Sequence, residues 1–361
     1  MKVALVHDYL NQYGGAERVL QALSEIFPEA PIYTLIYDKK RTGYVFSNKK
    51  IYTSFLQKIP FAKSYHRAFL LLMPLGIEQF DLSSYDLVIS DSASYAKGII
   101  TLPSTIHICY CHTPIRYAWD DSYRYIKEFG YPSFFKKIIP FFLNYIRIWD
   151  VQASKRVDYF IANSKFVKRR IKKYYRRKAE VIYPPVETKK FFISNSNKDY
   201  FLMVGRFLPY KRFDLAISVF NKLKLPLKIV GDGPEKSKLK KLALSNIEFL
   251  GLVSDEKLAK LYSNCKALIF PQEEDFGIVA LEAMASGRPV IAYKGGGVLE
   301  TVKEKETGIF FEEQTEESLM ETIRNFKESD FNPELIRNHS LKFDKEIFKQ
   351  KIKEFIESKL K

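Results

Sequence analysis

The sequence predicts an α/β protein built from two doubly wound parallel sheets, one in each half of the chain. Apolar runs of four to eight residues alternate with stretches of helical period throughout the 361 residues. This alternation is typical of parallel strands that are joined by helices. A chain of this length is expected to form two domains, and a hydrophobic content of 46% is enough for two cores.

The first half, residues 1–183, is expected to form one domain. Its clearest strands are predicted at residues 3–6, 87–89, 106–109 and 159–161. Residues 1–10 indicate a buried strand. They lack the long apolar core of a signal peptide. No stretch approaches the roughly 20 apolar residues that a membrane-spanning helix needs.

The second half, residues 184–340, has a regular strand, loop and helix pattern. Strands are predicted at residues 201–204, 227–230, 247–250, 267–270 and 290–292, with helices beginning near 211, 235, 255, 277 and 298. Pro184 and Pro185 mark the boundary between the halves, because consecutive prolines stop regular structure. A last helix at about 344–359 follows the end of this pattern and is expected to pack elsewhere.

Positive charge is concentrated in the first half. Residues 1–183 hold 28 Lys and Arg against 15 Asp and Glu, whereas residues 184–361 hold 30 against 27. Such a positive electrostatic field favours an anionic partner: phospholipid head groups, a pyrophosphate-linked acceptor or nucleic acid.

The chain has three cysteines, Cys109, Cys111 and Cys265, which form no Cys-x-x-Cys pair. Disulfides and a structural zinc are therefore not expected, and a reducing compartment fits.

Two glutamates eight residues apart carry the strongest chemical signal. Glu274 lies in an acidic loop before a helix that starts at about Gly277, and Glu282 lies more than one turn into that helix. The free N–H groups at a helix start can meet an anion. Carboxylates suit hydroxyls, so the pair indicates a nucleotide-sugar site. A capping acid beside an ordinary helix glutamate is the alternative.

Three more loops follow strands of the same predicted sheet. Gly205 and Arg206 precede Lys211, and together a guanidinium fork and a point charge suit a diphosphate. Residues 231–235 and 295–300 are glycine-rich. Because the carboxyl ends of parallel strands share one edge, all four loops are expected to line that edge.

A Gly-Gly pair, Gly14 and Gly15, follows the first strand and opens a helix. Such a pair lets backbone approach a phosphate closely. The alternative is a turn that needs unusual dihedral angles.

These motifs together resemble family 4 of the retaining glycosyltransferases. The resemblance is carried, in this order, by Gly-Arg-x(4)-Lys, Gly-Asp-Gly-Pro-Glu, Glu-x(7)-Glu with Phe-Gly-Ile-Val, and Gly-Gly-Gly-x-x-Glu. It implies the GT-B fold, in which two Rossmann-like domains face each other across a cleft. Residues 1–183 would bind the acceptor, residues 184–340 the nucleotide-sugar, and the helix in 341–361 would return to the first domain. The segment from His112 to Asp120 resembles a branch with bacterial O-antigen mannosyltransferases.

The resemblance also implies roles for residues. Arg206 and Lys211 would hold the donor diphosphate in place of a metal ion, Glu282 the ribose, and Glu274 the hydroxyls of the transferred sugar. His112 would sit beside the reacting carbon, although without the family a lone histidine is more often scaffold. Further donor contacts are expected from Gly14, Gly15, Gly205, Gly231, Phe276, Gly277, Ile278 and Val279, and acceptor-side contacts from Asp8 and Asp120.

The expected chemistry centres on the leaving diphosphate, which gains negative charge as the C1–O bond breaks. The family implies that the acceptor hydroxyl attacks on the face that the diphosphate leaves, with a phosphate oxygen taking its proton. Glu274 as a covalent nucleophile is the rival mechanism. No metal is expected, because no Asp-x-Asp metal motif is apparent in a suitable loop. No cofactor is expected either, because the nucleotide-sugar is a substrate.

A basic and aromatic surface is a second prediction. Nine of the fourteen residues 165–178 are Lys or Arg. Docking on an anionic membrane is one interpretation, and a solvated helix face with an aromatic core is the other. In residues 123–149, aromatics (Phe129, Phe134, Phe135, Phe141, Phe142) alternate with cations (Lys127, Lys136, Lys137, Arg147).

The predicted activity is therefore hexosyl transfer to a saccharide or lipid-linked saccharide in bacterial surface polysaccharide synthesis. GDP-mannose is the favoured donor, and a UDP-sugar of glucose, galactose or GlcNAc is the alternative. The location is expected to be cytoplasmic, either free or peripheral on the inner face of the plasma membrane. The net charge of +16 raises a nucleic-acid binder or a scaffold as remote alternatives. The chain lacks the signatures of nucleic-acid-binding modules, so nucleic acid is not an expected partner.

Overall fold

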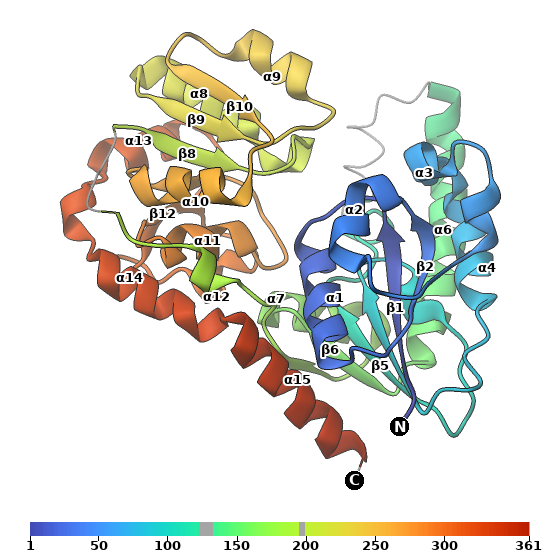
Figure 1. Ribbon diagram of the computed structural model, residues 1–361. Coiled ribbons are helices and arrows are strands. Elements are labelled where there is room, and N and C mark those ends of the chain that lie inside the picture. The colour runs from blue at the N-terminus through green and yellow to red at the C-terminus, as the bar shows by residue number, and fades with distance from the viewer. Residues whose placement is uncertain (121, 123–132, 195–198, 361) are drawn as a thin grey trace. The chain divides into compact units, whose positions relative to one another are not determined.

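The computed structural model describes residues 1–120, 122, 133–194 and 199–360 (Figure 1). For residues 64, 65, 67 and 133–137 it describes the backbone alone. The chain forms two compact units, residues 1–184 with 349–361, and residues 185–348. Each unit has its own parallel sheet, so the predicted α/β class with two doubly wound sheets is confirmed.

The first unit has a seven-stranded sheet in the order β3-β2-β1-β4-β5-β6-β7, and all neighbouring strands are parallel. The central strands β1, β4 and β5 are buried over almost their whole length, because helices cover both faces of such a sheet. The strands are β1 (Val3–Leu10), β2 (Ile32–Tyr37), β3 (Ile51–Thr53), β4 (Leu87–Ser92), β5 (Ile106–Cys111), β6 (Tyr159–Ala162) and β7 (Ala179–Val181). The helices are α1 (Gly15–Ile26), α2 (Lys39–Phe46), α3 (Ala62–Tyr65), α4 (Met73–Glu78), α6 (Ser133–Lys155) and α7 (Lys165–Tyr175).

The second unit has a six-stranded parallel sheet in the order β10-β9-β8-β11-β12-β13. Its strands are β8 (Phe201–Val204), β9 (Leu227–Val230), β10 (Ile247–Gly251), β11 (Leu268–Phe270), β12 (Val290–Tyr293) and β13 (Gly308–Phe311). Its helices are α8 (Phe213–Leu223), α9 (Lys236–Leu242), α10 (Asp255–Asn264), α11 (Ile278–Ala285), α12 (Val298–Thr301), α13 (Glu316–Asn325) and α14 (Pro333–Ser340).

Polar side chains begin several of these helices. Ser254, Thr315 and Asn332 each precede a helix and accept a hydrogen bond from one of its first backbone N–H groups. Such N-caps satisfy donors that have no partner within the helix. The positions of α10, α13 and α14 therefore follow from local sequence as well as from packing.

Each sheet has one point at which the chain reverses its direction of growth. In the first sheet this point lies between β1 and β4, and in the second it lies between β8 and β11. Ligands of doubly wound sheets bind outside the carboxyl ends of the strands at this switch point. The loops after these four strands are therefore where functional side chains are expected.

The last helix, α15 (Lys345–Leu360), links the two units. From Lys349 onward it belongs to the first unit, where Lys349 pairs with Glu25 at 2.7 Å and the Phe355 ring lies against Tyr159. The returning segment is thus shorter than the expected 341–361, because the chain before it packs in the second unit. No helix in the described part of the chain is both long enough and apolar enough to span a bilayer.

Candidate active site

Four loops line one edge of the second sheet, as the sequence predicts. They follow β9, β8, β11 and β12, which are neighbours in the sheet and run in the same direction. Lys211 ends a short turn after β8, and Glu274 lies in the loop after β11. These two side chains therefore flank the switch point of the second sheet. Arg206, on the same edge, is exposed.

Lys211 and Glu274 form an ion pair between Nζ and Oε1. Both side chains are mostly buried, at 14% and 17% exposed, so each charge compensates the desolvation of the other. Gln272 adds a hydrogen bond of 3.3 Å from Nε2 to the same carboxylate oxygen. The structure thus brings together a residue predicted for the diphosphate and one predicted for the sugar hydroxyls.

Close backbone contact explains two glycines of these loops. A Cβ on Gly231 would lie 1.9 Å from the carbonyl oxygen of Gly205, and one on Gly296 would lie 2.4 Å from that of Glu274. Gly205 also donates its N–H to the carbonyl of Val230 at 3.0 Å. The glycines hold neighbouring loops together, which is a packing reason for them independent of any ligand.

Helix α11 starts beside Glu274, with Gly277 as its N-cap at a φ of +95°. The N–H groups of Ile278 and Val279 lie in its first turn, where an α-helix provides no backbone acceptor. Phe276 is buried, at 3% exposed. The start of α11 therefore offers backbone donors at the same edge as the ion pair.

Glu282 lies inside the unit, at 2% exposed. One of its carboxylate oxygens accepts a hydrogen bond of 2.9 Å from the hydroxyl of Tyr262, at the end of α10. Sequence reasoning missed Tyr262. The sequence around Tyr262 gives no signal for this contact, because it joins two different helices, α10 and α11.

At the switch point of the first sheet, Asp91 lies between two histidines. Its Oδ1 is 2.6 Å from Nε2 of His112, and its Oδ2 is 2.8 Å from Nδ1 of His7. His7 on β1 and Asp91 on β4 are register partners, and His112 follows β5. Burial alone would raise the pKa of Asp91, but the charges and hydrogen bonds of His112 and His7 lower it.

The cluster continues from His7 to the Gly-Gly turn. Nε2 of His7 lies 3.6 Å from Oε1 of Glu17, and Oε2 of Glu17 accepts the backbone N–H of Gly14 at 2.8 Å. Gly14 is the N-cap of α1, and Gly15 is its first residue. Burial lowers the pKa of His7, but hydrogen bonds to Asp91 and Glu17 outweigh it and raise the pKa to about 10.

Asp8 has a structural role that the sequence did not reveal. Its buried carboxylate accepts four backbone N–H groups, from Ala93 and Ser94 at 2.7 and 2.8 Å and from Tyr95 and Ala96 at 2.6 Å. Four donors occupy the acceptor capacity of a carboxylate. Asp8 therefore holds the loop after β4, and the acceptor-side contact expected of it stays a prediction.

Asp120 is likewise held by protein groups. It pairs with the guanidinium of Arg170 and accepts a hydrogen bond from the hydroxyl of Tyr174, both on α7. The preceding Trp119 stacks on Tyr174 and donates from Nε1 to Asp150 at 2.8 Å. These contacts anchor the end of the His112 segment, and the acceptor contact expected of Asp120 stays a prediction.

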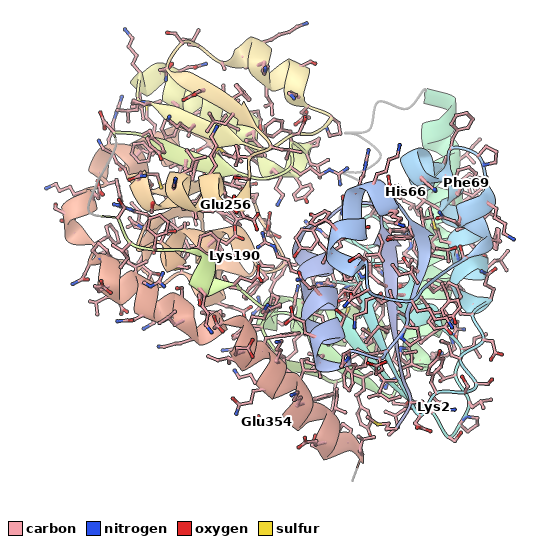
Figure 2. All side chains as sticks on the ribbon, in the orientation of Figure 1. Lys2, His66, Phe69, Lys190, Glu256 and Glu354 are labelled. Carbon is pink, nitrogen blue, oxygen red and sulfur yellow. The ribbon has the colours of Figure 1, made fainter. Side chains whose placement is uncertain are left out.

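A further histidine lies near the loop after β1. Nδ1 of His66 is 3.1 Å from the side-chain amide of Asn11, and its ring lies 5.0 Å from that of Tyr9 (Figure 2). Sequence analysis gave His66 no role. Charged side chains far from this edge, such as Lys2 and Glu354, are exposed.

The cations of the basic run 165–178 lie in different surroundings. Arg170 is buried beside Asp120, and Arg177 donates to the carbonyl of Val157 at 2.6 Å after α6. Five cations of the run line a groove of about 930 Å³, with Tyr159 and Phe355. Those cations are Lys168, Lys172, Arg176, Arg177 and Lys178. The groove lies at the amino ends of β6 and β7, on the opposite edge of the sheet from His112.

The aromatic part of that prediction is only partly described. On α6, Phe141 is 76% exposed and Phe142 is 44% exposed, so neither is a core residue. Arg147 donates to the carbonyl of Ala118 at 2.9 Å. Lys127 and Phe129, and the side chains of Phe134, Phe135, Lys136 and Lys137, lie outside the described residues.

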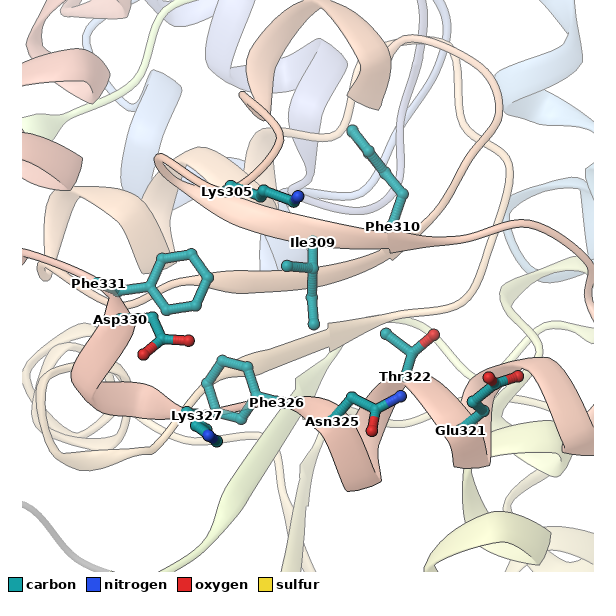
Figure 3. Close-up of a pocket in the computed structure, with 10 residues that line it drawn as sticks. All are labelled: Lys305, Ile309, Phe310, Glu321, Thr322, Asn325, Phe326, Lys327, Asp330 and Phe331. Atoms are coloured by element: carbon teal, nitrogen blue, oxygen red, sulfur yellow. The ribbon is translucent and has the colours of Figure 1, made fainter.

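One pocket of the second unit lies away from the predicted site. It has a volume of about 550 Å³ beside β13 and α13, where the rings of Phe326 and Phe331 stack (Figure 3). None of the residues predicted to bind the donor lines it.

Comparison with protein families matches both halves of the chain. Residues 13–190 match the model described as Glycosyltransferase Family 4, and residues 186–346 match Glycosyl transferases group 1. The two matches overlap at residues 186–190 and together extend over residues 13–346.

Three curated relatives are similar to this chain. A glycosyltransferase of Methanocaldococcus jannaschii is 32% identical over 53% of this chain and 53% of that protein. O-antigen chain mannosyltransferase C of Escherichia coli is 31% identical over 35% of this chain and 36% of its own length. The chain thus spans about half or less of these two proteins. Alpha-1,3/1,6-mannosyltransferase ALG2 of Candida glabrata is 26% identical over 97% of this chain and 90% of its own length.

A solved structure shares the fold over the full length. Anabaena HepE, determined in complex with UDP, has a TM-score of 0.75 at 18% identity and covers 99% of this chain and 100% of its own. Three findings indicate the same family of proteins: the two parallel-sheet domains, the four loops at one sheet edge and the two family matches. The chain therefore belongs to the glycosyltransferases of the GT-B fold, with a family 4 domain followed by a group 1 domain.

Proposed function

We propose that this protein is a retaining, metal-independent hexosyltransferase that transfers mannose from GDP-mannose. Its acceptor would be a saccharide or lipid-linked saccharide of bacterial surface polysaccharide synthesis. The Lys211–Glu274 pair beside the start of α11 carries this proposal, because it places a cation, a carboxylate and helix N–H groups at one switch point. The mannosyltransferase names of the Escherichia coli and Candida glabrata relatives support the sugar.

In the proposed donor site, Arg206 and Lys211 hold the diphosphate. Lys211 would exchange Glu274 for a phosphate oxygen, which frees the Glu274 carboxylate to accept hydrogen bonds from sugar hydroxyls. Glu282, already buried and bonded to Tyr262, would accept from the ribose. The N–H groups of residues 276–279 would complete the contacts with the sugar and the phosphate.

The proposed catalysis acts on the leaving group. As the C1–O bond breaks, the diphosphate gains charge, and fixed cations and the positive end of α11 stabilise that charge without reorganisation. The acceptor hydroxyl would attack from the same face and give its proton to a phosphate oxygen. Glu274 attacking as a nucleophile would instead leave a glycosyl ester on its side chain.

In the first unit, we assign the acceptor to the edge that carries His112. His112 would lie beside the reacting carbon, and the turn at Gly14 and Gly15 would approach the diphosphate. The anchors of Asp8 and Asp120 hold the loops on this edge, so their effect on the acceptor is indirect.

Peripheral membrane docking is the second part of the proposal. Phe141, Tyr145 and Ile148 are 76%, 48% and 57% exposed and share one face of α6, since they are spaced by four and three residues. Aromatic side chains on such a face suit the interface of an anionic leaflet. Co-sedimentation with anionic and with neutral vesicles tests this. Equal binding to both vesicles, without salt dependence, would contradict the electrostatic part.

Ligand-induced stabilisation tests the donor. The melting point is measured with GDP-mannose, UDP-glucose, UDP-GlcNAc and UDP-galactose. A ligand at about 100 times its Kd adds about 2.7 kcal/mol to the stability of the native state. We expect GDP-mannose to give the largest increase. A larger increase with a UDP-sugar would move the assignment to that donor, and no increase with any of them would overturn the donor site.

A further inference from the structure

Four side chains, alternately carboxyl and imidazole groups, cross the switch point of the first sheet. They run in the order Glu17, His7, Asp91 and His112, with neighbouring groups 3.6, 2.8 and 2.6 Å apart. The four residues come from α1, β1, β4 and the segment after β5. The order is fixed by the sheet, because His7 and Asp91 are register partners.

Only one end of this row reaches the surface. The side chain of Asp91 is fully buried, and those of His7 and Glu17 are 3% and 5% exposed. The side chain of His112 is 13% exposed. A ligand can therefore touch His112, whereas the other three act on a ligand through it.

The hydrogen bonds fix where protons reside. A carboxylate is an acceptor only, so Asp91 accepts one hydrogen bond from Nε2–H of His112 and another from Nδ1–H of His7. His7 lies between two carboxylates, which favours its doubly protonated form. In neutral His112 the remaining nitrogen, Nδ1, carries a lone pair, and within the described part of the chain it has no protein partner.

We propose that Asp91 is a positioning residue that holds the His112 imidazole with its proton on Nε2 and its Nδ1 lone pair available to a sugar hydroxyl. His7 and Glu17 extend this arrangement to the backbone N–H of Gly14. The imidazole and the Gly14 turn are thereby held by one set of contacts. The hydroxyl ligand rests on the proposed glycosyltransferase function, whereas the fixed tautomer follows from the contacts alone.

His107 provides a matched comparison within the same strands. It is buried on β5 and its Nε2 is 2.8 Å from the hydroxyl of Ser90 on β4, but within the described residues its ring has no carboxylate partner; only its backbone N–H donates to Asp158. Burial lowers its pKa to about 3, so it is neutral at pH 8. A histidine of purely structural role on these strands should behave like His107.

The first test reads the protons directly. The chain has five histidines, so ¹⁵N-detected spectra of the full-length protein at pH 8 can be assigned with single His→Gln variants. We expect His112 to carry its proton on Nε2 and His7 to be doubly protonated. Asp91→Asn should shift the His112 tautomer and leave the His107 signals in place. A wild-type His112 protonated on Nδ1 alone, or an unchanged tautomer in Asp91→Asn, would overturn the proposal.

The second test separates positioning from stability. With the donor identified by the melting-point panel, Asp91→Asn should lower kcat by about tenfold to a hundredfold, as for a misplaced reacting group, with donor KM within about threefold. His107→Gln should lower the melting point and leave kcat unchanged. Equal kcat in Asp91→Asn and wild type would refute the positioning role.

Failure of the proposed function has a different signature. A wild-type protein that neither transfers nor hydrolyses any donor would contradict the enzyme assignment, while the spectra would still decide the tautomer. If Asp91→Asn does not fold, Glu17→Gln replaces it. That variant should remove the second carboxylate partner of His7, and a singly protonated His7 at pH 8 is the expected result. A His7 that stays doubly protonated would contradict the extension to Gly14.

Discussion

Lys211 and Glu274 pair across the switch point of the second sheet, although 63 positions separate them in the sequence. Each belongs to a different loop, and each is mostly buried. The two charges thus compensate each other, although their predicted ligands are a phosphate for Lys211 and a sugar hydroxyl for Glu274. Ligand binding would have to replace this ion pair with one contact from Lys211 to phosphate and one from Glu274 to a hydroxyl.

Removal of the positive charge of Lys211 should impair catalysis much more than folding. In Lys211→Ala, the diphosphate loses a preorganised positive charge, so we expect kcat/KM to fall by about 100-fold or more. Steady-state kinetics with the identified donor measure this. Lys222→Ala is the matched control, because Lys222 pairs with Glu316 on the exposed surface of the same unit at 2.5 Å. Comparable losses in both variants would contradict the assignment.

Glu274→Gln should separate sugar recognition from nucleotide binding. The amide keeps the shape but loses the charge, so transfer is expected to fall by about 100-fold while the Kd for the free nucleoside diphosphate stays within about threefold. Calorimetry and turnover assays measure the two quantities. A trapped glycosyl ester on Glu274, detected by mass spectrometry, would instead support the covalent mechanism.

Gly231→Ala should destabilise the second unit by about 3 kcal/mol, because the new methyl group would overlap a carbonyl in a packed loop. Its Cβ would lie 1.9 Å from the oxygen of Gly205. Gly251→Ala is the control, since its φ is +67° but nothing lies within 4 Å of the added atom. That variant should lose only about 1 kcal/mol of stability, because alanine at this positive φ is strained. Thermal unfolding of both variants decides, and equal losses would count against the packing argument.

The stability contributed by His7 should depend on pH in a defined direction. Its pKa is raised from 6.5 to about 10, so the folded state holds the proton more tightly than the unfolded state. This contribution is fully present below pH 6.5 and is lost as the pH rises towards 10.

We therefore expect the difference in melting point between wild type and His7→Gln to be largest at pH 6 and to shrink by pH 9.5. Removing one member of a buried pair costs about 3 kcal/mol or more, which makes the difference measurable. A difference that grows with pH would contradict the proton assignment.

Much of the fold was predictable because strand patterns are local. The five strands expected in the second half match β8 to β12 to within a residue or two, but β13 was missed. In the first half, β3 and β7 have three residues each and lie at sheet edges, so they carry too short a pattern. The strand β2 was also missed, although Thr34 alone interrupts its aliphatic and aromatic residues.

The site was predictable where it depends on strand ends and not where it depends on register. Glu274 and Lys211 were placed together because parallel strands end at one edge. Asp91 was missed because its partners His7 and His112 lie 84 and 21 positions away, and only strand pairing brings them into contact. The structural role of Asp8 was missed because its four backbone donors come from a loop after another strand.

The path of α15 limits how the protein can be divided. Ile352, Phe355 and Ile356 are 1%, 6% and 4% exposed in the part of the helix that belongs to the first unit. A fragment ending at Pro184 would lack this part of the helix and would expose an apolar patch to solvent, which favours aggregation. Adding a synthetic peptide of residues 345–360 should restore the solubility of this fragment, because the peptide would bind and cover the exposed apolar surface.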